Sequence, residues 1–131
     1  MTNTGSILII DDDASMRELL GECLAPCGYV VSHAISGQQA VELMDSQAFT
    51  VALLDLMLPD ADGMDIFRRI RERQPKMQVI VLTGYASLET AIEALRIGAY
   101  DYVTKPFDAS VIQSTVRRAV EKYRFSLRLD A

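Results

Sequence analysis

Residues 51–60 read VALLDLMLPD, an apolar run that carries one carboxylate, Asp55, and then breaks at Pro59. Short apolar runs of this kind are typical of strands that are buried on both faces of a parallel sheet. Such sheets bind their ligands just beyond the carboxyl ends of the strands, where Asp55 falls. Taken alone, Asp55 is more simply explained as a polar residue that closes the strand or caps the next element. A functional role for Asp55 therefore needs support from the rest of the chain.

The chain alternates strand-like and helical patterns five times. Apolar runs at 7–10, 29–31, 51–55, 79–82 and 100–104 are each followed by apolar residues at helical spacing. This alternation predicts an α/β fold with a single doubly wound sheet of five parallel strands, right-handed crossovers and helices on both faces. The flavodoxin-like strand order 2-1-3-4-5 is the economical arrangement, and it brings the ends of the first and third strands together.

Length and composition limit the classes of function. A chain of 131 residues, half of them apolar, is long enough for one domain with a core and too short for two ordinary domains. No apolar run approaches the roughly 20 residues of a membrane span, and residues 1–5 do not resemble a leader. We therefore expect a cytoplasmic protein without a membrane partner. The net charge of -5 argues against direct nucleic-acid binding by this domain.

The sulfur and imidazole side chains carry no chemistry in this interpretation. We expect Cys23 and Cys27 to be buried, reduced thiols, because no further Cys or His lies near enough to complete a zinc site. His33 has no acid or nucleophile near it in the sequence, so we expect it to be an ordinary strand residue.

Polar residues follow four of the predicted strands. Acids occupy 11–13 after the first strand, Asp55 ends the third, Thr83 ends the fourth and Lys105 follows the fifth. One acid of the first group can cap the next helix, but capping does not explain three. Converging carboxylates would raise one another's pKa unless a cation lay among them, and oxygen ligands suit Mg²⁺. A hydroxyl and an ammonium beside them can hold a phosphoryl group.

Four motifs occur in a diagnostic order along the chain. They are Ile9-Ile10-Asp11-Asp12-Asp13, residues 54–63 (LDLMLPDADG), Val81-Leu82-Thr83-Gly84, and residues 101–107 (DYVTKPF). With these motifs the chain resembles the receiver domain of two-component response regulators, the CheY-like family, from Ile7 to about Tyr123. The resemblance implies that Asp55 takes a phosphoryl group from a histidine kinase or phosphotransfer protein, with Mg²⁺ as the cofactor.

The resemblance also implies the roles of individual residues. The implied metal ligands are Asp11, Asp12, Asp55 and the backbone carbonyl of Met57, and the implied phosphoryl-oxygen partners are Thr83 and Lys105. Thr83 and Tyr102 would form the switch, although Tyr102 is equally explained as an aromatic residue that half-buries an edge strand. The Lys105–Pro106 bond is a candidate for the cis isomer.

The implied chemistry is consistent with the side chains themselves. A carboxylate can attack phosphorus and form a mixed anhydride, while Mg²⁺ and Lys105 offset the charge on the transferred group. Hydrolysis of the anhydride needs an in-line water molecule, and neither flanking residue, Met57 or Tyr85, readily orients water. We therefore expect slow self-dephosphorylation and no enzymatic turnover of substrates.

The resemblance extends to the output of the signal. A phosphoryl group on Asp55 would attract Thr83, let Tyr102 move inward, and alter the surface of the fourth helix, fifth strand and fifth helix. On this surface Asp101 with Arg117 or Arg118 is a candidate for cross-subunit ion pairs in a phosphorylation-dependent homodimer. Surface pairs of this kind usually contribute little.

We divide the chain into an N-terminal tail at 1–5, the receiver domain at 6–124, and a helix extension or the start of a linker at 125–131. The basic, amphipathic end favours a piece of a longer regulator whose effector domain is absent, over a stand-alone protein. The phrases at 83–86 and 98–102 resemble receivers that are attached to transcriptional activators.

Three other classes of protein share parts of this pattern. Aspartate-nucleophile phosphatases of the haloacid dehalogenase type carry a second acid two residues after the nucleophile, where this chain has Met57. Flavodoxin-type carriers bind the flavin phosphate in a Ser/Thr/Gly-rich loop, whereas residues 11–13 are acidic and the chain has no Trp. A nucleotide hydrolase would need a G-x-x-x-x-G-K-[ST] phosphate loop, which the sequence lacks.

Overall fold

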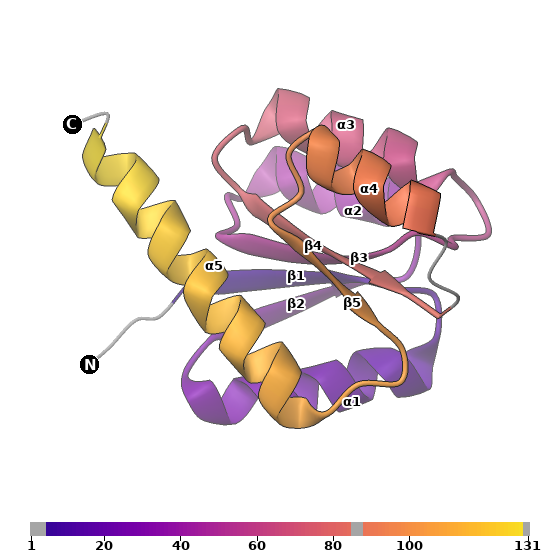
Figure 1. Cartoon of the computed structure of the whole chain (residues 1–131), viewed down its shortest axis with the longest axis horizontal. Helices are drawn as coiled ribbons and strands as arrows, with labels where there is room; N and C mark the ends of the chain where they lie inside the picture. Colours follow the sequence, from indigo (N-terminus) through magenta and orange to yellow (C-terminus); the bar gives the residue numbers. More distant parts are fainter. Residues whose placement is uncertain (1–4, 85–87, 130–131) are drawn as a thin grey trace.

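The computed structural model describes residues 5–84 and 88–129, in which five strands and five α-helices alternate (Figure 1). The strands are β1 (Ser6–Ile10), β2 (Val30–Ala34), β3 (Val51–Asp55), β4 (Gln78–Thr83) and β5 (Asp101–Thr104). The helices are α1 (Ala14–Leu24), α2 (Gly37–Ser46), α3 (Gly63–Arg73), α4 (Leu88–Arg96) and α5 (Ala109–Leu129), and a 3-10 turn, η1 (Ala25–Cys27), follows α1.

All strand pairs are parallel, and the order in the sheet is β2-β1-β3-β4-β5. This result confirms the predicted doubly wound, flavodoxin-like α/β fold. In the register of β1 with β3, Ile10 lies opposite Leu54, so the residues that follow these two strands leave the sheet side by side. Asp55 in turn lies opposite Leu82 of β4, one residue before Thr83.

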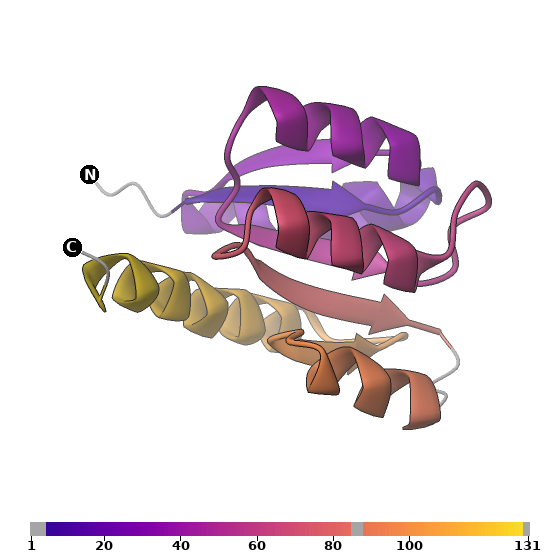
Figure 2. The same ribbon diagram turned by 90° about the horizontal axis from the view of Figure 1, so that it is seen from above.

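Helices cover both faces of the sheet, with α1 and α5 on one face and α2, α3 and α4 on the other (Figures 1 and 2). Side-chain alternation along the strands separates two hydrophobic clusters. In β1, Leu8 and Ile10 pack in the cluster under α2 and α3, while Ile7 and Ile9 pack in the cluster under α1 and α5. Because both faces are covered, the strands read as continuous apolar runs in the sequence.

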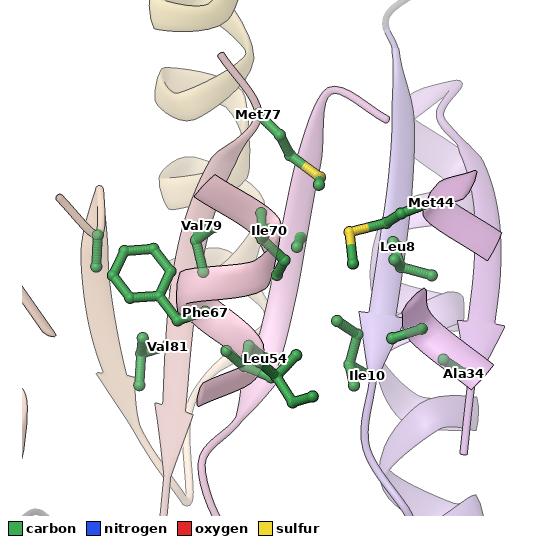
Figure 3. Packing of buried hydrophobic residues seen from close by; sticks show 14 of the residues in the cluster. Leu8, Ile10, Ala34, Met44, Leu54, Phe67, Ile70, Met77, Val79 and Val81 are labelled. Atoms are coloured by element: carbon green, nitrogen blue, oxygen red, sulfur yellow. The ribbon is translucent and has the colours of Figure 1, made fainter. Parts of the chain in front are cut away.

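Helix α3 anchors the first of these clusters. Figure 3 shows Phe67 and Ile70 of α3 lying over the sheet near Val79 and Val81 of β4, and all four side chains are fully buried. Burying one such side chain contributes about 1.5–3 kcal/mol of hydrophobic stabilisation. The helix begins where Asp62 accepts a hydrogen bond from the N–H of Met64 at 2.9 Å. This packing fixes the far end of the loop that leaves Asp55.

The structure corrects the prediction that both cysteines are buried. Cys23 is a buried residue of α1, but Cys27 is exposed. Helix α1 ends at Leu24, and the η1 turn that contains Pro26 carries Cys27 to the surface. The periodicity of a continuous helix would have kept Cys27 near the face of Cys23, one helical turn away.

Arg71, in the last turn of α3, is half-buried. Its guanidinium lies over the Phe67 ring, 5.4 Å from the centroid, and donates to the carbonyls of Pro75 and Met77. The turn after α3 exposes carbonyl groups that the helix cannot satisfy, and a long side chain in its last turn can reach them. Burial accordingly lowers the pKa of Arg71.

Helix α5 is the longest element and runs without a break through residue 124 to Leu129. Its buried positions include Ile112, Val116 and Ala119, whereas Tyr123 is only half-buried. In the described parts of the chain, none of the helices combines the length and the apolar character that a membrane crossing requires.

We expect Gly63→Ala to lower the free energy of unfolding by about 2 kcal/mol, measured by urea denaturation. A Cβ atom at Gly63 would lie 2.5 Å from the Leu56 Cα and 2.7 Å from its carbonyl oxygen, so backbone would have to move. The matched control is Gly84→Ala, because a Cβ there meets no heavy atom within 4 Å and should leave stability unchanged. A Gly63 variant as stable as the wild type would contradict this account of the packing.

Candidate functional site

Asp55 is the last residue of β3, and its side chain is buried with 5% exposure. Its Oδ1 accepts a hydrogen bond from the N–H of Met57 at 2.9 Å. Its Oδ2 lies 3.4 Å from the Lys105 Nζ. One oxygen of the carboxylate therefore bonds to the loop after β3, and the other faces an ammonium. A residue that only ended the strand would not need the second partner.

The three acids after β1 have different surroundings. Asp13 is the N-cap of α1, and its Oδ1 accepts from the N–H groups of Ser15 and Met16. Asp11 is fully buried, and its Oδ1 accepts from the N–H of Asp13 at 2.9 Å. Asp12 is exposed. The capping explanation thus accounts for one acid, as expected, and leaves the other two for the site.

Carboxylate oxygens of Asp11, Asp12 and Asp55 all lie within 4.8 Å of one another. The three side chains come from the ends of β1 and β3, so the adjacency of these strands brings them together. Mg²⁺ prefers six oxygen ligands at about 2.1 Å, so ligands on opposite sides of the ion are about 4 Å apart. An all-oxygen cluster of this size fits Mg²⁺ with water molecules as further ligands. The carbonyl of Met57, the fourth predicted ligand, belongs to the second residue after Asp55.

Lys105 supplies positive charge to this cluster. Its Nζ donates to Asp11 Oδ2 at 3.1 Å and to Asp55 Oδ2 at 3.4 Å. Burial lowers the pKa of Lys105, but attraction to Asp55 and Asp11 outweighs it, so that pKa lies above its usual range. The bond between Lys105 and Pro106 is cis, as predicted. The ammonium that was predicted to hold a phosphoryl group is thus paired with two of the acids here.

The electrostatics of Asp11 differ in cause from the prediction. Its pKa is raised, chiefly because burial disfavours the ionised form, and repulsion by Asp55 adds less. The N–H of Asp13 and the ammonium of Lys105 oppose the increase. The sequence pattern predicted repulsion between carboxylates as the cause, because burial of one particular acid depends on how β1 is covered.

A pocket of about 310 Å³ opens beside Asp55. It is lined by Asp55, Met57, Thr83, Gly84 and Lys105. Residues from three strand ends therefore face one space in which a nucleophilic carboxylate, a hydroxyl and an ammonium are available. Tyr85, predicted to flank the same space, lies outside the described residues. Met57 is 76% exposed at the mouth of the pocket.

Tyr102 lies on β5, beside the strand that ends at Thr83. It pairs in register with Val81, and Thr104 pairs with Thr83. Because alternate residues of a strand share a face, Val81 and Thr83 point to the same side of the sheet as Tyr102. Tyr102 is half-buried against the cluster under α2 and α3. Thr83 and Tyr102, the two predicted switch residues, therefore lie on neighbouring strands and on the same face of the sheet, with Thr83 two residues beyond the partner of Tyr102.

Two contacts at the site were not predicted from the sequence. The guanidinium of Arg17 donates to the backbone carbonyl of Asp11 at 2.8 Å, six residues away. Asp60, in the loop after β3, accepts from the N–H groups of Gly37 and Gln38 at 3.0 and 3.3 Å. No local sequence pattern signals either contact. The partner of Arg17 is a main-chain carbonyl, and the partners of Asp60 belong to a helix more than 20 residues away.

A family model described as the response regulator receiver domain matches residues 7–117. The regulatory protein AtoC of Escherichia coli (strain K12) is 38% identical over 121 residues, or 92% of this chain and 26% of that protein. The transcriptional regulatory protein ZraR of the same strain is 40% identical over 114 residues, or 87% and 26%. This chain therefore spans about a quarter of the length of both relatives.

Solved structures agree with the sequence comparison. The crystal structure of the receiver domain of NtrX from Brucella abortus matches with a TM-score of 0.84 at 31% identity. That match covers 88% of this chain and 98% of the NtrX domain. The likeness therefore extends over nearly all of both molecules.

We expect Mg²⁺ at about 100 times its Kd to raise the free energy of unfolding by about 2.7 kcal/mol, measured by denaturant titration. Asp12→Asn should remove most of this increase, because it deletes one charged ligand of the cluster. Asp13→Asn is the matched control, since Asn also caps helices and Asp13 points to the α1 backbone. If Mg²⁺ stabilised the Asp12→Asn variant as much as the wild-type protein, the assignment of Asp12 as a metal ligand would be contradicted.

Proposed function

Because the chain belongs to the family of response regulator receiver domains, we propose that Asp55 accepts a phosphoryl group in a Mg²⁺-dependent reaction and thereby switches an output. Membership of this family makes the chain a signalling domain and not an enzyme that turns over substrates. The observation that carries the proposal is the buried Asp55 carboxylate, which shares one pocket with Thr83 and Lys105 and lies beside Asp11 and Asp12.

The proposed donor is a phosphohistidine of a histidine kinase or phosphotransfer protein. A carboxylate oxygen of Asp55 attacks phosphorus, the bond from phosphorus to the imidazole nitrogen breaks, and the nitrogen keeps the electron pair. Lys105 and Thr83 bond the transferred oxygens. Mg²⁺, held by Asp11, Asp12, Asp55 and the carbonyl of Met57, supplies further neutralisation of charge when bound.

The geometry around Lys105 supports this role. Its ammonium already lies within 3.4 Å of an Asp55 oxygen, so a phosphoryl group on that carboxylate would be within its reach. The ion pairs of Lys105 with Asp11 and Asp55 hold these groups close together, which reduces the reorganisation that transfer requires. The acidic pocket without a metal would repel a phosphoryl donor, which is consistent with a requirement for a divalent cation.

The proposed response passes from Thr83 to Tyr102 and then to the surface of α4, β5 and α5. Exposed apolar residues occur on this surface, among them Ile92 and Leu95 of α4 and Val111 of α5. They are suited to a protein partner or to a second copy in a phosphorylation-dependent homodimer. Asp101 with Arg117 or Arg118 would supply the cross-subunit ion pairs.

We place the receiver domain at residues 6–124 and regard 125–131 as the start of a linker to an effector domain. The relatives AtoC and ZraR extend well beyond the matched segment, and ZraR is named a transcriptional regulatory protein. Phe125 and Leu129 are exposed apolar residues near the end of α5. These observations support a transcriptional output through a domain outside this chain.

Incubation with acetyl phosphate and Mg²⁺ should label the wild-type protein once, whereas Asp55→Asn should remain unlabelled in intact-mass spectrometry. Asn cannot form the mixed anhydride, and it replaces Asp with little change in volume. Asp45→Asn is the control, because Asp45 is an exposed acid that pairs with Arg73, away from the pocket. Labelling of the Asp55→Asn variant would refute the proposal that Asp55 is the phosphoacceptor. Rapid release of many phosphates by the wild-type protein would indicate a phosphatase.

Met57→Asn should shorten the lifetime of the phosphorylated protein several-fold, measured as the decay of label after removal of the donor. Met57 lines the pocket and is 76% exposed, so an amide there can orient a water molecule without disturbing the core. Met57→Leu should decay like the wild type, because it offers no hydrogen bond. If the phosphorylated Met57→Asn protein lived longer than the phosphorylated wild type, the proposal that Met57 keeps hydrolysis of the phosphoryl group slow would be contradicted.

A further inference from the structure

The loop that joins β3 to α3, residues 56–62, is held at several points. At its start, the N–H of Met57 donates to Asp55 Oδ1 at 2.9 Å. Met57 and Asp62 form an antiparallel bridge that closes the loop into a turn. At its end, Asp62 caps α3. These bonds connect Met57 to the strand and to α3, but they leave the tip of the turn to be fixed by other contacts.

Asp60, at the tip of this turn, bonds to the beginning of α2. Its Oδ1 accepts from the N–H of Gly37 at 3.0 Å, and its Oδ2 accepts from the N–H of Gln38 at 3.3 Å. The N–H of the next residue, Gln39, donates to Ser36 Oγ at 3.1 Å. Two of the helix's first three N–H groups therefore depend on a residue more than 20 positions away. The positive end of the helix favours a carboxylate there.

The contact between the turn and α2 is close as well as polar. A Cβ atom at Gly37 would lie 2.6 Å from Ile66 Cδ1 and 3.2 Å from the Ala61 Cβ. The beginning of α2 thus packs directly on the turn and on α3, and a Cβ atom at Gly37 would require the Ile66 side chain to shift. The two carboxylate bonds and this packing hold the turn against the beginning of α2.

We propose that Asp60 is a positioning residue for the metal site, which tethers the β3–α3 turn to α2 and so holds the Met57 carbonyl where Mg²⁺ needs it. This inference rests on the proposed function, because it assumes that the carbonyl of Met57 is a ligand. Residues that orient ligands in this way commonly affect metal affinity, although they do not touch the ion.

The alternative role for Asp60 is only to cap α2, and Ser36 distinguishes the two. Ser36 caps the same helix from the β2–α2 connection, and its hydroxyl bonds to Gln39 of the helix rather than to the turn. Asp65 provides a second control. It is an exposed acid that pairs with Arg68, and together with Asp60 it lines a surface pocket between α2 and the start of α3. Loss of its charge imitates the electrostatic effect of losing Asp60 without touching the tether.

The test is calorimetric titration of the full chain with Mg²⁺ alone, together with thermal unfolding of each variant. Asp60→Ala should weaken Mg²⁺ binding about tenfold. Asp60→Asn should weaken it less, since its amide oxygen still accepts one of the two bonds. Ser36→Ala should lower the melting temperature but leave the Kd unchanged, and Asp65→Asn should leave the Kd unchanged.

A wild-type Kd in either Asp60 variant would overturn the proposal, as would an equal loss of affinity in Ser36→Ala or Asp65→Asn. The two levels of inference fail differently. Wild-type protein that does not bind Mg²⁺ would overturn the proposed function together with the role of Asp60. Normal binding by the wild type and by the Asp60 variants would overturn the role of Asp60 alone.

Discussion

The ion pairs of Lys105 with Asp11 and Asp55 are the interaction on which the rest of the site depends. Three carboxylates at neighbouring strand ends repel one another, and one of them, Asp11, is fully buried. An ammonium at 3.1 and 3.4 Å from two of them offsets this repulsion within the protein itself. The parallel sheet makes the arrangement feasible, because it directs the ends of β1, β3 and β5 to the same edge.

The acids of the chain divide into groups with different tasks. Asp13 and Asp62 cap the helices that follow them, and Asp11, Asp12 and Asp55 form the cluster that suits Mg²⁺. Asp60 does neither, because its carboxylate satisfies the beginning of a helix that precedes it in the sequence. The chemistry of a carboxylate is the same in each group, so only its partners determine its role.

Much of the fold was predictable, and the errors have identifiable causes. Strands covered on both faces are apolar throughout, so their positions and order followed from pattern and topology rules. The burial of Cys27 was predicted wrongly, because free thiols usually pack as small apolar groups, whereas the η1 turn carries this one to the surface. The site residues were gathered correctly, since parallel strands end at one edge, but the assignment of Asp55 as phosphoacceptor came from the family motifs.

The sequence by itself determined the class of the sheet, its strand order and the residues at the carboxyl ends of its strands, because these depend on local apolar pattern and on general rules of chain connection. Only the tertiary structure decided which charged groups have partners far away in the sequence. Lys105 meets Asp11 across 94 positions, and Asp60 meets Gly37 across 23. Such contacts form because packed helices and strands bring distant segments within hydrogen-bond distance, and no periodicity in the chain encodes that proximity.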